Sequence, residues 1–599
     1  MKRLKGILVV LTAVLFVVIP LSASSRAVFK DVIEQVHTLV PRLSDGVSIT
    51  ADDGSNEILS HIEGDELVFD ETKQLSFTVT YSDGWLVCNK YSNFFPNDSR
   101  ASRTQTDDDT VEYTFSAVTG ESVSLEEWES VTVYASASEL PKLEIDIDMD
   151  FADVDRETWV DASFSITLGT KQFESGDYEG TGTVKGRGNS SWTYPKKPYS
   201  IKLEKKASLL DIPKTKKYAI IPSYYDGSLM RNYITYKGWQ ELYGIDYVTK
   251  CEFVDVYLNG VYNGIYILCE RIDIEKSKVD IEEADADNMT GGYLIEKDVN
   301  GRIDFNEDLW FNCPYWANQA KDYFVLKSPE PDDTALADAM RAYLESYMQD
   351  VHASIMGESD RPYTDYVDTS SWVDFIIVQE IAKNIDGPMK TSCWLYKDRD
   401  DDHIYMTAPW DFDFAYGLVS WNNQSEEHND VYDCPPANTP EDFMIVNSSN
   451  PWMDTLYDTV PDFQYAVKLR YTLYRHTLID GMFDMIDEQA AYLNAAAPAN
   501  QALWGRNFST GVRNLKSWLT NRIEWLDSVW LLDTVPEQGD VNLDGEINSY
   551  DALMVMRHAL GIRPLDDFGI VFADVNGDGE VDSLDALLIL RISLGIRWN

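Results

Sequence analysis

Cysteine is scarce in this chain, and histidine is nearly as rare. The 599 residues include six cysteines, none in a CxxC pair, and seven histidines without ligand spacing near any cysteine. Thiols this few and scattered exclude a disulfide-dense scaffold, and the missing Cys/His spacing disfavours zinc. Cys251 and Cys269 flank two expected strands. They are either bridged or buried free thiols, and the sequence leaves both alternatives open.

Positive charge is the second shortage. Lys and Arg number 50 against 101 Asp and Glu, which gives a formal net charge of −51. Binding to a phosphate backbone depends on clustered positive charge, so we expect no nucleic-acid partner and no attraction to an anionic membrane. Because 44% of the residues are hydrophobic, the chain can still bury more than one core.

Long apolar runs are missing beyond the first residues. Lys2, Arg3 and Lys5 precede the run GILVVLTAVLFVVIP, and the small residues LSASS follow it. This layout is typical of a secretory signal peptide, and the run is shorter than the ~20 residues that a spanning helix needs. We expect a signal peptide over residues 1–25, cleaved between Ala23 and Ala27. After its removal we expect no membrane span and a secreted protein, extracellular or at the cell surface.

The order of patterns along the chain predicts an α+β fold. Short alternating runs such as LSFTVTYS and SVTVYASA predict a β-rich, sandwich-like region over residues 28–140. Further on, FVDVYLNG and VYNGIYILCERID read as two strands around an Asn-Gly turn. Helical spacing prevails later, at residues 330–355, 371–384 and 452–532. We therefore expect an α+β domain over residues 141–532, a linker at 533–538 and a small all-α domain at 539–599.

An internal repeat lies in the last part of the chain. GDVNLDGEINSYDALMVMRHALGIR returns as ADVNGDGEVDSLDALLILRISLGIR, with a period of 34 residues. Each copy alternates oxygen-bearing side chains as a calcium loop does, with Gly545 and Gly579 at the sharp turn. The predicted ligands of two calcium ions are Asp540, Asn542, Asp544, Glu546, Asn548 and Asp551, then Asp574, Asn576, Asp578, Glu580, Asp582 and Asp585.

Two features separate these loops from an EF-hand: the twelfth ligand is Asp rather than Glu, and we expect no helix entering either loop. The segment over residues 539–599 resembles a type I dockerin, the module that docks proteins on the cohesin domains of cellulosome-like scaffolds. The resemblance implies calcium binding and a cohesin partner on a scaffoldin. It places the cohesin contacts at Ser549, Tyr550, Ser583 and Leu584, with Arg557 and Arg591 as further candidates. A calcium-stapled fold without a partner is the alternative.

A strip over residues 185–217 inverts the charge of the chain, with ten Lys or Arg against Glu204 and Asp211. Closely spaced glycines open it, at positions 180, 182, 186 and 188. Such a strip suits a phosphate, because backbone N–H groups can approach its oxygens while cations neutralise them. A solvated basic face is the alternative. An inward lysine on a strand can reach phosphates, and YSIKL puts Lys202 in such a run, with Glu241 or Glu270 as its orienting partner.

Three aspartates further along suit a matching metal ion. Asp386 follows an apolar helix in NIDGPMK, while Asp411 and Asp413 lie between aromatic residues in APWDFDFAYG. A carboxylate flanked by apolar side chains is costly unless it meets a cation. Phosphoryl transfer needs a metal and cations on the phosphates, and one carboxylate to orient the hydroxyl. Alternatively, these acids cap helices or pair with Arg187, Lys196 or Lys197.

Several strings between residues 140 and 530 resemble, in order, the CotH family of atypical secreted kinases related to spore coat proteins. They are KGRGNSSW, YPKKPYSIKL, SLMRN, VYLNGVYNGIYIL, GGYLIEKD, NIDG and PWDFDFAYG. The resemblance implies a two-lobed, protein-kinase-like fold that uses ATP with Mg²⁺ or Mn²⁺. Lys202 then contacts the nucleotide phosphates, Asp386 is catalytic, and Asp411 and Asp413 hold the metal. Auxiliary phosphate-site residues are Arg187, Arg231 and Glu270.

The chain departs from the kinase pattern after Asp386, where no Asn follows to hold a second metal. Thr391 or Ser392 would have to substitute, or one metal suffices. The Trp-containing insertion SWNNQSEEHNDVYDC after Gly417 could close over the site or block it.

Three functions remain open. The first is a secreted kinase that phosphorylates Ser or Thr of unknown proteins. The second is a non-catalytic structural or surface component with a kinase-like fold. The third is a polysaccharide-degrading enzyme with paired carboxylates, against which the basic strip argues because a neutral glycan does not need that charge.

Overall fold

The computed structural model describes nine strands between residues 48 and 137, and then residues 138–314, 322–387, 389–419, 438–443, 450–565 and 567–596. The predicted signal peptide and the insertion after Gly417 lie outside these residues. The chain divides into two compact units. Unit 1 takes the described residues up to Gly227 together with Glu252–Cys269 and Gln489–Phe508, and unit 2 takes Ser228–Cys251, Glu270–Glu488 and the residues from Ser509 onward.

The predicted β-rich region is confirmed by three small antiparallel sheets in unit 1. They have the strand orders β1-β4-β7-β6, β2-β3-β8 and β5-β9. The strands are β1 (Ser48–Ala51), β2 (Ser60–Glu63), β3 (Glu66–Phe69), β4 (Lys73–Thr80), β5 (Trp85–Lys90), β6 (Ala101–Asp107), β7 (Thr110–Ala117), β8 (Ser122–Ser124) and β9 (Thr132–Ala137).

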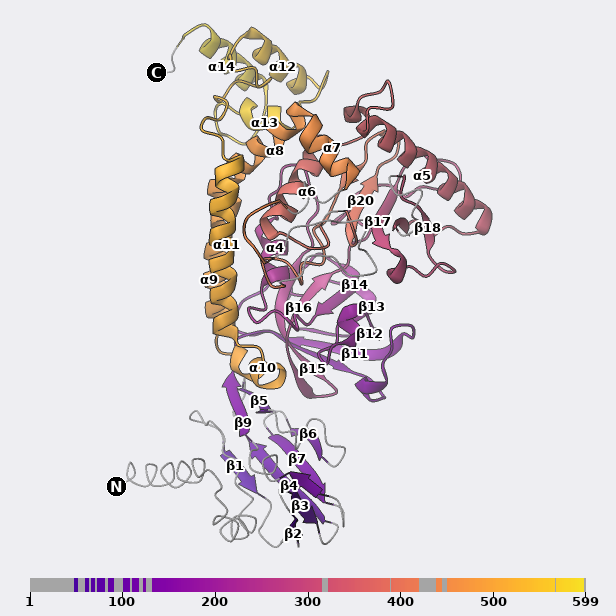
Figure 1. Ribbon diagram of the computed structural model, residues 1–599, viewed down its shortest axis with the longest axis vertical. Helices are drawn as coiled ribbons and strands as arrows, with labels where there is room; N and C mark the ends of the chain where they lie inside the picture. The colour runs from indigo at the N-terminus through magenta and orange to yellow at the C-terminus, as the bar shows by residue number, and fades with distance from the viewer. Residues whose placement is uncertain are drawn as a thin grey trace, which may run out of the picture. The chain divides into compact units, whose positions relative to one another are not determined.

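A closed barrel of seven strands follows in unit 1 (Figure 1). Its order is β10-β11-β12-β13-β14-β16-β15, and the parallel pairing of β10 with β15 closes it. The strands are β10 (Lys142–Asp146), β11 (Val160–Thr167), β12 (Tyr178–Gly186), β13 (Tyr199–Ala207), β14 (Thr215–Ile221), β15 (Cys251–Leu258) and β16 (Val261–Glu270). Asn259 and Gly260, both with positive φ, make the predicted turn between the last two strands.

Alternating side chains fill the barrel interior. Along β10 and β13, Leu143, Ile145, Ile201 and Leu203 are each 1% exposed or less. Large side chains such as Tyr218 and Tyr266 join the same core. The interior of the barrel is therefore filled by side chains, as expected for a barrel of this size.

Unit 2 combines one antiparallel sheet with helices. The sheet has the order β18-β19-β17-β20-β21. Its strands are β17 (Tyr293–Val299), β18 (Leu309–Asn312), β19 (Asp322–Ser328), β20 (Cys393–Lys397) and β21 (Tyr405–Met406). The helices before the repeat are α4 (Arg231–Gly238), α5 (Thr334–Ile355), α6 (Thr369–Ala382), α7 (Pro451–Thr459), α8 (Pro461–Tyr474) and α11 (Phe508–Trp530). The unit boundary falls within α9 (Asp480–Leu493), after Glu488, and α10 (Ala497–Trp504) belongs to unit 1.

Helix α6 is the buried centre of unit 2. Every residue from Ser370 to Ala382 is buried, as expected for a helix that is apolar on nearly all sides. The Asp368 carboxylate caps its first turn by accepting from the Ser371 N–H at 2.7 Å. Lys383 ends the helix in the left-handed conformation, with a φ of 44°. This sharp end directs the chain into the loop that carries Asp386.

The repeat region (residues 539–596) is helical, as predicted. Its helices are α12 (Ser549–Ala559), α13 (Asp567–Ala573) and α14 (Ser583–Ser593), and α12 and α14 pack side by side (Figure 1). Val541, Val555, Ala573 and Ile589 lie in its small core. The expectation that no helix enters either loop is wrong for the second copy, because α13 ends directly before Asp574. Phe568, Phe572 and Ala573 of this helix are buried, and Ala573 lies in the small core, so apolar burial stabilises the helix.

Cys251, Cys269, Cys313 and Cys393 are buried thiols that are not in disulfides, so the bridge between the first two is not formed. Among the described residues, no helix combines the length and the apolar character needed to cross a membrane.

Candidate functional site

Asp386 lies in the loop after α6 and is 8% exposed. Two cations of unit 2 approach its carboxylate at equal distance. The Lys390 ammonium lies 3.9 Å from one oxygen, and the Arg302 guanidinium lies 3.9 Å from the other. The backbone N–H of Asp386 also donates to the Asn384 side chain at 3.3 Å, which orders the loop. The carboxylate is thus held between two positive charges.

Asp411 comes from a different segment and reaches the same guanidinium. One of its carboxylate oxygens lies 3.7 Å from Arg302 and accepts a hydrogen bond from the Ser392 hydroxyl at 3.2 Å. Its backbone has a φ of 66°, a strained value for a residue with a side chain. Asn384 donates to the Asp411 carbonyl at 3.3 Å and so ties the two acid-bearing segments together. Strain that packing maintains in this way is common at functional sites.

Arg302 joins the two predicted acids, and the sequence analysis missed it. It ends the short 3₁₀ turn Asn300–Arg302, directly after β17. Its guanidinium donates to the Thr391 hydroxyl at 2.7 Å and to the Ser392 hydroxyl at 3.1 Å. Burial lowers the pKa of Arg302, but the carboxylates of Asp386 and Asp411 outweigh burial and raise it overall. The group is therefore a permanent positive charge.

Asp298 supports this arrangement from β17. It accepts a hydrogen bond from the Thr391 hydroxyl at 2.5 Å. Burial and the neighbouring Glu296 raise the pKa of Asp298 to about 6. Thr391 therefore donates to one buried carboxylate while it accepts from Arg302, and its position is fixed on both sides.

Asp413 is positioned by α4 instead. The Asn232 amide donates to its carboxylate at 2.6 Å, and the amide oxygen of Asn232 accepts from the Phe412 N–H at 2.8 Å. Arg231, the residue before Asn232 on α4, donates to the carbonyls of Ala415 and Tyr416 at 2.9 and 3.2 Å. The predicted phosphate contact Arg231 is thus buried against the backbone of the acid-bearing segment.

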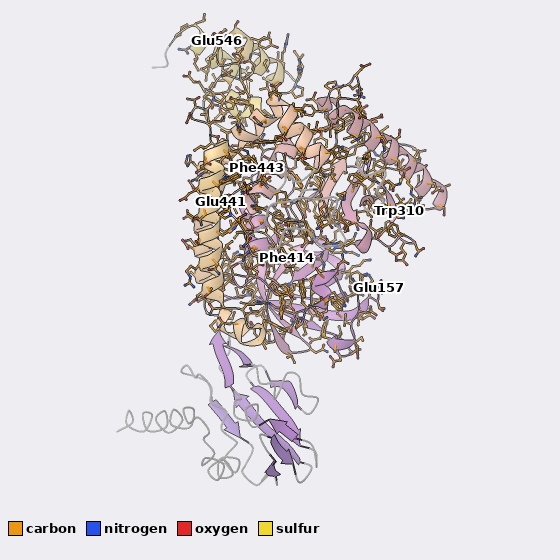
Figure 2. All side chains as sticks on the ribbon, in the orientation of Figure 1. Glu157, Trp310, Phe414, Glu441, Phe443 and Glu546 are labelled. Carbon is orange, nitrogen blue, oxygen red and sulfur yellow. The ribbon has the colours of Figure 1, made fainter. Side chains whose placement is uncertain are left out.

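A second pair of cations anchors the segment of residues 438–443. Lys383 donates to the carbonyls of Thr439 and Glu441, and Arg522 of α11 donates to those of Pro440 and Asp442. Phe443, which is labelled in Figure 2, packs against Trp525 and Trp530 of α11. Since Lys383 lies three residues before Asp386, these contacts also fix the start of its loop.

Glu270 is fully buried at the end of β16. One carboxylate oxygen accepts from the Lys250 N–H at 3.1 Å, while the other has no hydrogen-bond partner among the described residues. Burial raises the pKa of Glu270 to about 7. A buried carboxyl with an unused oxygen is a costly feature that a bound cation or donor would relieve. Glu241, the other predicted partner of Lys202, is exposed on the turn after α4.

The basic strip lies in unit 1. The inward orientation expected of Lys202 is wrong: its side chain is exposed, because Ile201 and Leu203 on either side occupy the barrel interior. Arg187 is half-buried before β13. The lysine that points inward is Lys196, which is 1% exposed and donates to the carbonyls of Pro222 and Ile265. Whether Lys202 and Arg187 contact phosphates stays a prediction.

The acids of unit 2 fit a divalent cation. The Asp411 carboxylate and the neighbouring Ser392 hydroxyl are hard oxygen groups, which Mg²⁺ or Mn²⁺ accepts as ligands. That Asp411 and Asp413 together hold such an ion stays a prediction. Among the described residues, no three His, Cys, Asp or Glu side chains converge on one point.

The two loops of the repeat region also fit their predicted ion. The Asp540 carboxylate accepts from the N–H groups of Asp544 and Gly545, at 3.1 and 2.9 Å, so the loop curls around it. Asp574 accepts in the same way from Asp578 and Gly579. Gly545 and Gly579 have φ values of 87° and 86°, which glycine adopts without strain. Such loops direct oxygen atoms inward, as calcium requires.

The twelfth ligands cap the helices that follow. Asp551 accepts from the N–H groups of Val541, Asn542 and Asn548, and Asp585 accepts from those of Val575, Asn576 and Asp582. Each thus closes a capping box with the ninth residue of its own loop. The shorter Asp at this position serves both as a candidate ligand and as a helix cap.

The residues after each ninth ligand start α12 and α14 and are exposed. Tyr550 and Leu584 are 49% and 44% exposed, and Ser549 and Ser583 are exposed beside them. Apolar side chains at equivalent positions of both helices and the turns after them continue this surface. They are Leu553, Leu560 and Ile562, then Leu587, Leu594 and Ile596. A small domain that exposes this many large apolar side chains has the surface of a docking module.

Comparison with known proteins gives two family matches. The model of the CotH kinase protein family matches residues 184–526, and the model of the dockerin type I domain matches residues 538–592. Both resemblances noted in the sequence are thereby confirmed. No curated protein matches the chain.

Proposed function

The chain belongs to the CotH kinase family and carries a type I dockerin domain, and we propose that it is a secreted protein kinase docked on a scaffold. In this proposal it transfers the γ-phosphoryl group of ATP to Ser or Thr hydroxyls of proteins. The proposal includes the two-lobed, protein-kinase-like arrangement that the family implies, and it includes ATP binding.

The observation that carries the proposal is the shared position of two acids from separate segments. Asp386 and Asp411 both lie within 4 Å of the Arg302 guanidinium, on oxygens 3.9 and 3.7 Å away. Phosphoryl transfer needs one carboxylate that orients the attacking hydroxyl and another that holds a metal ion. Asp386, which is largely buried and braced by two cations, suits the first task, and the more exposed Asp411 suits the second, together with Asp413.

In the reaction, the substrate hydroxyl oxygen forms a bond to the γ-phosphorus while the bond from that phosphorus to the bridging oxygen of ADP breaks. The hydroxyl proton passes to the Asp386 carboxylate. A divalent ion, when bound, neutralises charge on the phosphate oxygens. Lys390, whose ammonium lies 3.9 Å from Asp386, adds a positive charge beside the transferring group. Lys202 and Arg187 keep their predicted role as phosphate contacts.

The dockerin part of the proposal rests on the exposed apolar residues of α12 and α14. A cohesin that covers Tyr550 and Leu584 would bury side chains that now face solvent, which favours association. Dockerins are typical of extracellular cellulosome components, in agreement with the predicted signal peptide. The partner is thus a cohesin domain, and docking places the kinase domain next to other docked proteins, which are its proposed substrates.

The proposal is tested by incubating the full chain with labelled ATP, Mn²⁺ and a mixture of docked proteins. Asp386→Asn and Asp411→Asn should each lower label transfer by about 10²-fold or more, because each removes an essential group. Asp338→Asn, on the exposed face of α5, is the matched control and should behave like the wild type. Label transfer that survives both site substitutions would exclude the assigned chemistry. No transfer and no nucleotide binding by the wild type would favour the non-catalytic alternative.

A further inference from the structure

We infer that Arg302 is the fixed second cation of the phosphoryl-transfer site, so that this kinase binds one divalent ion where a two-metal kinase binds two. The inference rests on the proposed function and specifies its metal requirement. Three observations support it: the position of the Arg302 guanidinium, its hydrogen bonds to the Thr391 and Ser392 hydroxyls, and the groups that surround it.

Arg302 lies close to both predicted acids. Its NH1 nitrogen lies 3.7 Å from an Asp411 oxygen, and its NH2 nitrogen lies 3.9 Å from an Asp386 oxygen. In a kinase with two metal ions, the ions lie between the carboxylate on the metal-binding segment and the catalytic loop. Arg302 brings positive charge to this same place without a metal.

A second metal ion would need its own ligands from the catalytic loop. The catalytic loop lacks the Asn that would bind it, and Thr391 and Ser392 are the substitutes in sequence. Both hydroxyls already accept hydrogen bonds from Arg302, at 2.7 and 3.1 Å. Each also donates its proton to a carboxylate, Thr391 to Asp298 and Ser392 to Asp411. Two of the three hydrogen-bonding sites of each hydroxyl are therefore used.

The Arg302 guanidinium is held in place by the groups around it. The Arg302 side chain is 22% exposed, and Thr391, Ser392 and two carboxylates surround it. A guanidinium remains charged in proteins, and like charges this close repel strongly where water is largely excluded. A divalent ion at the Thr391 and Ser392 hydroxyls would have to displace Arg302 or bear its repulsion. Asp411 and Asp413 remain able to hold one ion, with Asp413 fixed by Asn232.

In the reaction this guanidinium supplies the positive charge that a second metal ion supplies in a two-metal kinase. Its N–H groups can donate to oxygens of the transferring phosphoryl group, whose negative charge moves toward ADP as the bond to the bridging oxygen breaks. Because its charge is covalently fixed, the site does not depend on a weakly bound second ion. The contribution to rate should resemble that of other preorganised cations, about 10²-fold to 10³-fold.

The experiment counts Mn²⁺ ions bound per full-length chain, in saturating calcium and with a non-hydrolysable ATP analogue. The variants are Arg302→Ala, Arg302→Lys and, as control, Arg341→Ala on α5. Calcium loops contribute equally to all of them, so only differences in the count matter. We expect equal counts for the wild type, Arg302→Lys and Arg341→Ala, and one additional ion for Arg302→Ala. Label transfer should fall about 10²-fold in Arg302→Ala and recover in part as Mn²⁺ is raised.

The outcomes separate the two proposals. If the wild type binds no Mn²⁺ with the analogue and transfers no label to protein, the proposed function fails. If the wild type labels protein but Arg302→Ala binds the same number of ions, Arg302 does not replace a metal and the inference is overturned. Two analogue-dependent ions in the wild type would overturn it as well. Should Arg302→Ala fail to fold, Arg302→Gln keeps an N–H donor for the hydroxyls while removing the charge, and the same count applies.

Discussion

The side-chain oxygen of Asn500 accepts a hydrogen bond from the Lys196 ammonium at 3.0 Å, although 304 residues separate the two in sequence. The same oxygen accepts from the Ile265 N–H at 3.1 Å. Both groups are buried, and Lys196 also lies 4.5 Å from the centre of the Tyr266 ring. Helix α10 therefore supplies an acceptor without which the barrel would hold an incompletely paired cation.

Replacing Asn500 by alanine should destabilise unit 1. The change removes the shared acceptor of a buried ammonium and of a buried N–H, each costly to leave unpaired, so we expect a loss of about 2–4 kcal/mol in the free energy of unfolding. Chemical denaturation followed by tryptophan fluorescence measures it. Asn494→Ala, at an exposed position after α9, should change the value by less than about 0.5 kcal/mol. Equal effects of the two would show that the bond to Lys196 contributes little.

Asp255 should make stability depend on pH. Burial raises the pKa of this carboxyl to about 7, although Ser138 and Tyr262 donate hydrogen bonds to it. Between the ordinary value of 3.8 and about 7, the unfolded chain releases a proton that the folded chain keeps. Stability from this group is therefore complete below the lower value and falls as pH rises, by about 1 kcal/mol per pH unit.

The test compares Asp255→Asn with the wild type by thermal denaturation between those pH values. The substitution should flatten the decline, because asparagine does not titrate. Asp161→Asn, on the exposed side of β11, is the control and should leave the slope unchanged. A slope that stays the same in Asp255→Asn would mean that this carboxyl keeps an ordinary pKa.

Arg522 and Glu380 form an ion pair at 2.8 Å in which neither side chain is exposed. Arg522→Ala should lower the free energy of unfolding by about 3–5 kcal/mol, since it leaves a buried carboxylate without its partner. The double substitution Arg522→Met with Glu380→Leu should recover part of this loss, as removal of both charges avoids the unpaired group. Recovery should be incomplete because Arg522 also pairs the carbonyls of Pro440 and Asp442.

A matched control lies on the same helix. Lys516 pairs with Asp487 at 2.6 Å, but both side chains are substantially exposed, so Lys516→Ala should cost at most about 1 kcal/mol. Urea denaturation of the four chains gives the comparison. A loss for Arg522→Ala no larger than that for Lys516→Ala would contradict the assigned weight of the buried pair.

Asp585→Ala should affect the second calcium loop alone. The carboxylate is both a predicted ligand and the acceptor of three N–H groups, so its loss should lower calcium affinity in that loop by about 10-fold or more and loosen the start of α14 by about 1–2 kcal/mol. Calcium titration should show one tight site instead of two. Ser593→Ala, near the end of α14, should keep both sites. Two unchanged sites in Asp585→Ala would remove this residue from the ligand set.

Local patterns predicted much of the fold. The apolar run of α6 was expected as a helix over residues 371–384 and is found at Thr369–Ala382. The two-residue difference has a local cause, since the Asp368 cap starts the helix early and the left-handed Lys383 ends it. The repeat was even more informative, because two copies of the same oxygen pattern constrain each other.

Contacts between residues far apart in the chain could not be predicted from the sequence. Arg302 lies in a short turn without periodicity, and nothing local connects it to Asp386, 84 residues further on. The basic strip posed a related difficulty. Ten cations carry no mark of which one is buried, and Lys196 precedes β13, where strand alternation does not apply. The pairing with Asn500 that makes its burial tolerable depends on a helix from a distant part of the chain.

The parallel pairing of β10 with β15 has a consequence for contacts between copies of the chain. An open sheet ends in strands whose N–H and C=O groups can add a strand from a neighbouring molecule. The barrel closes on itself and has no such terminal strand. This part of the fold therefore offers no strand edge to which a neighbouring chain could add a strand.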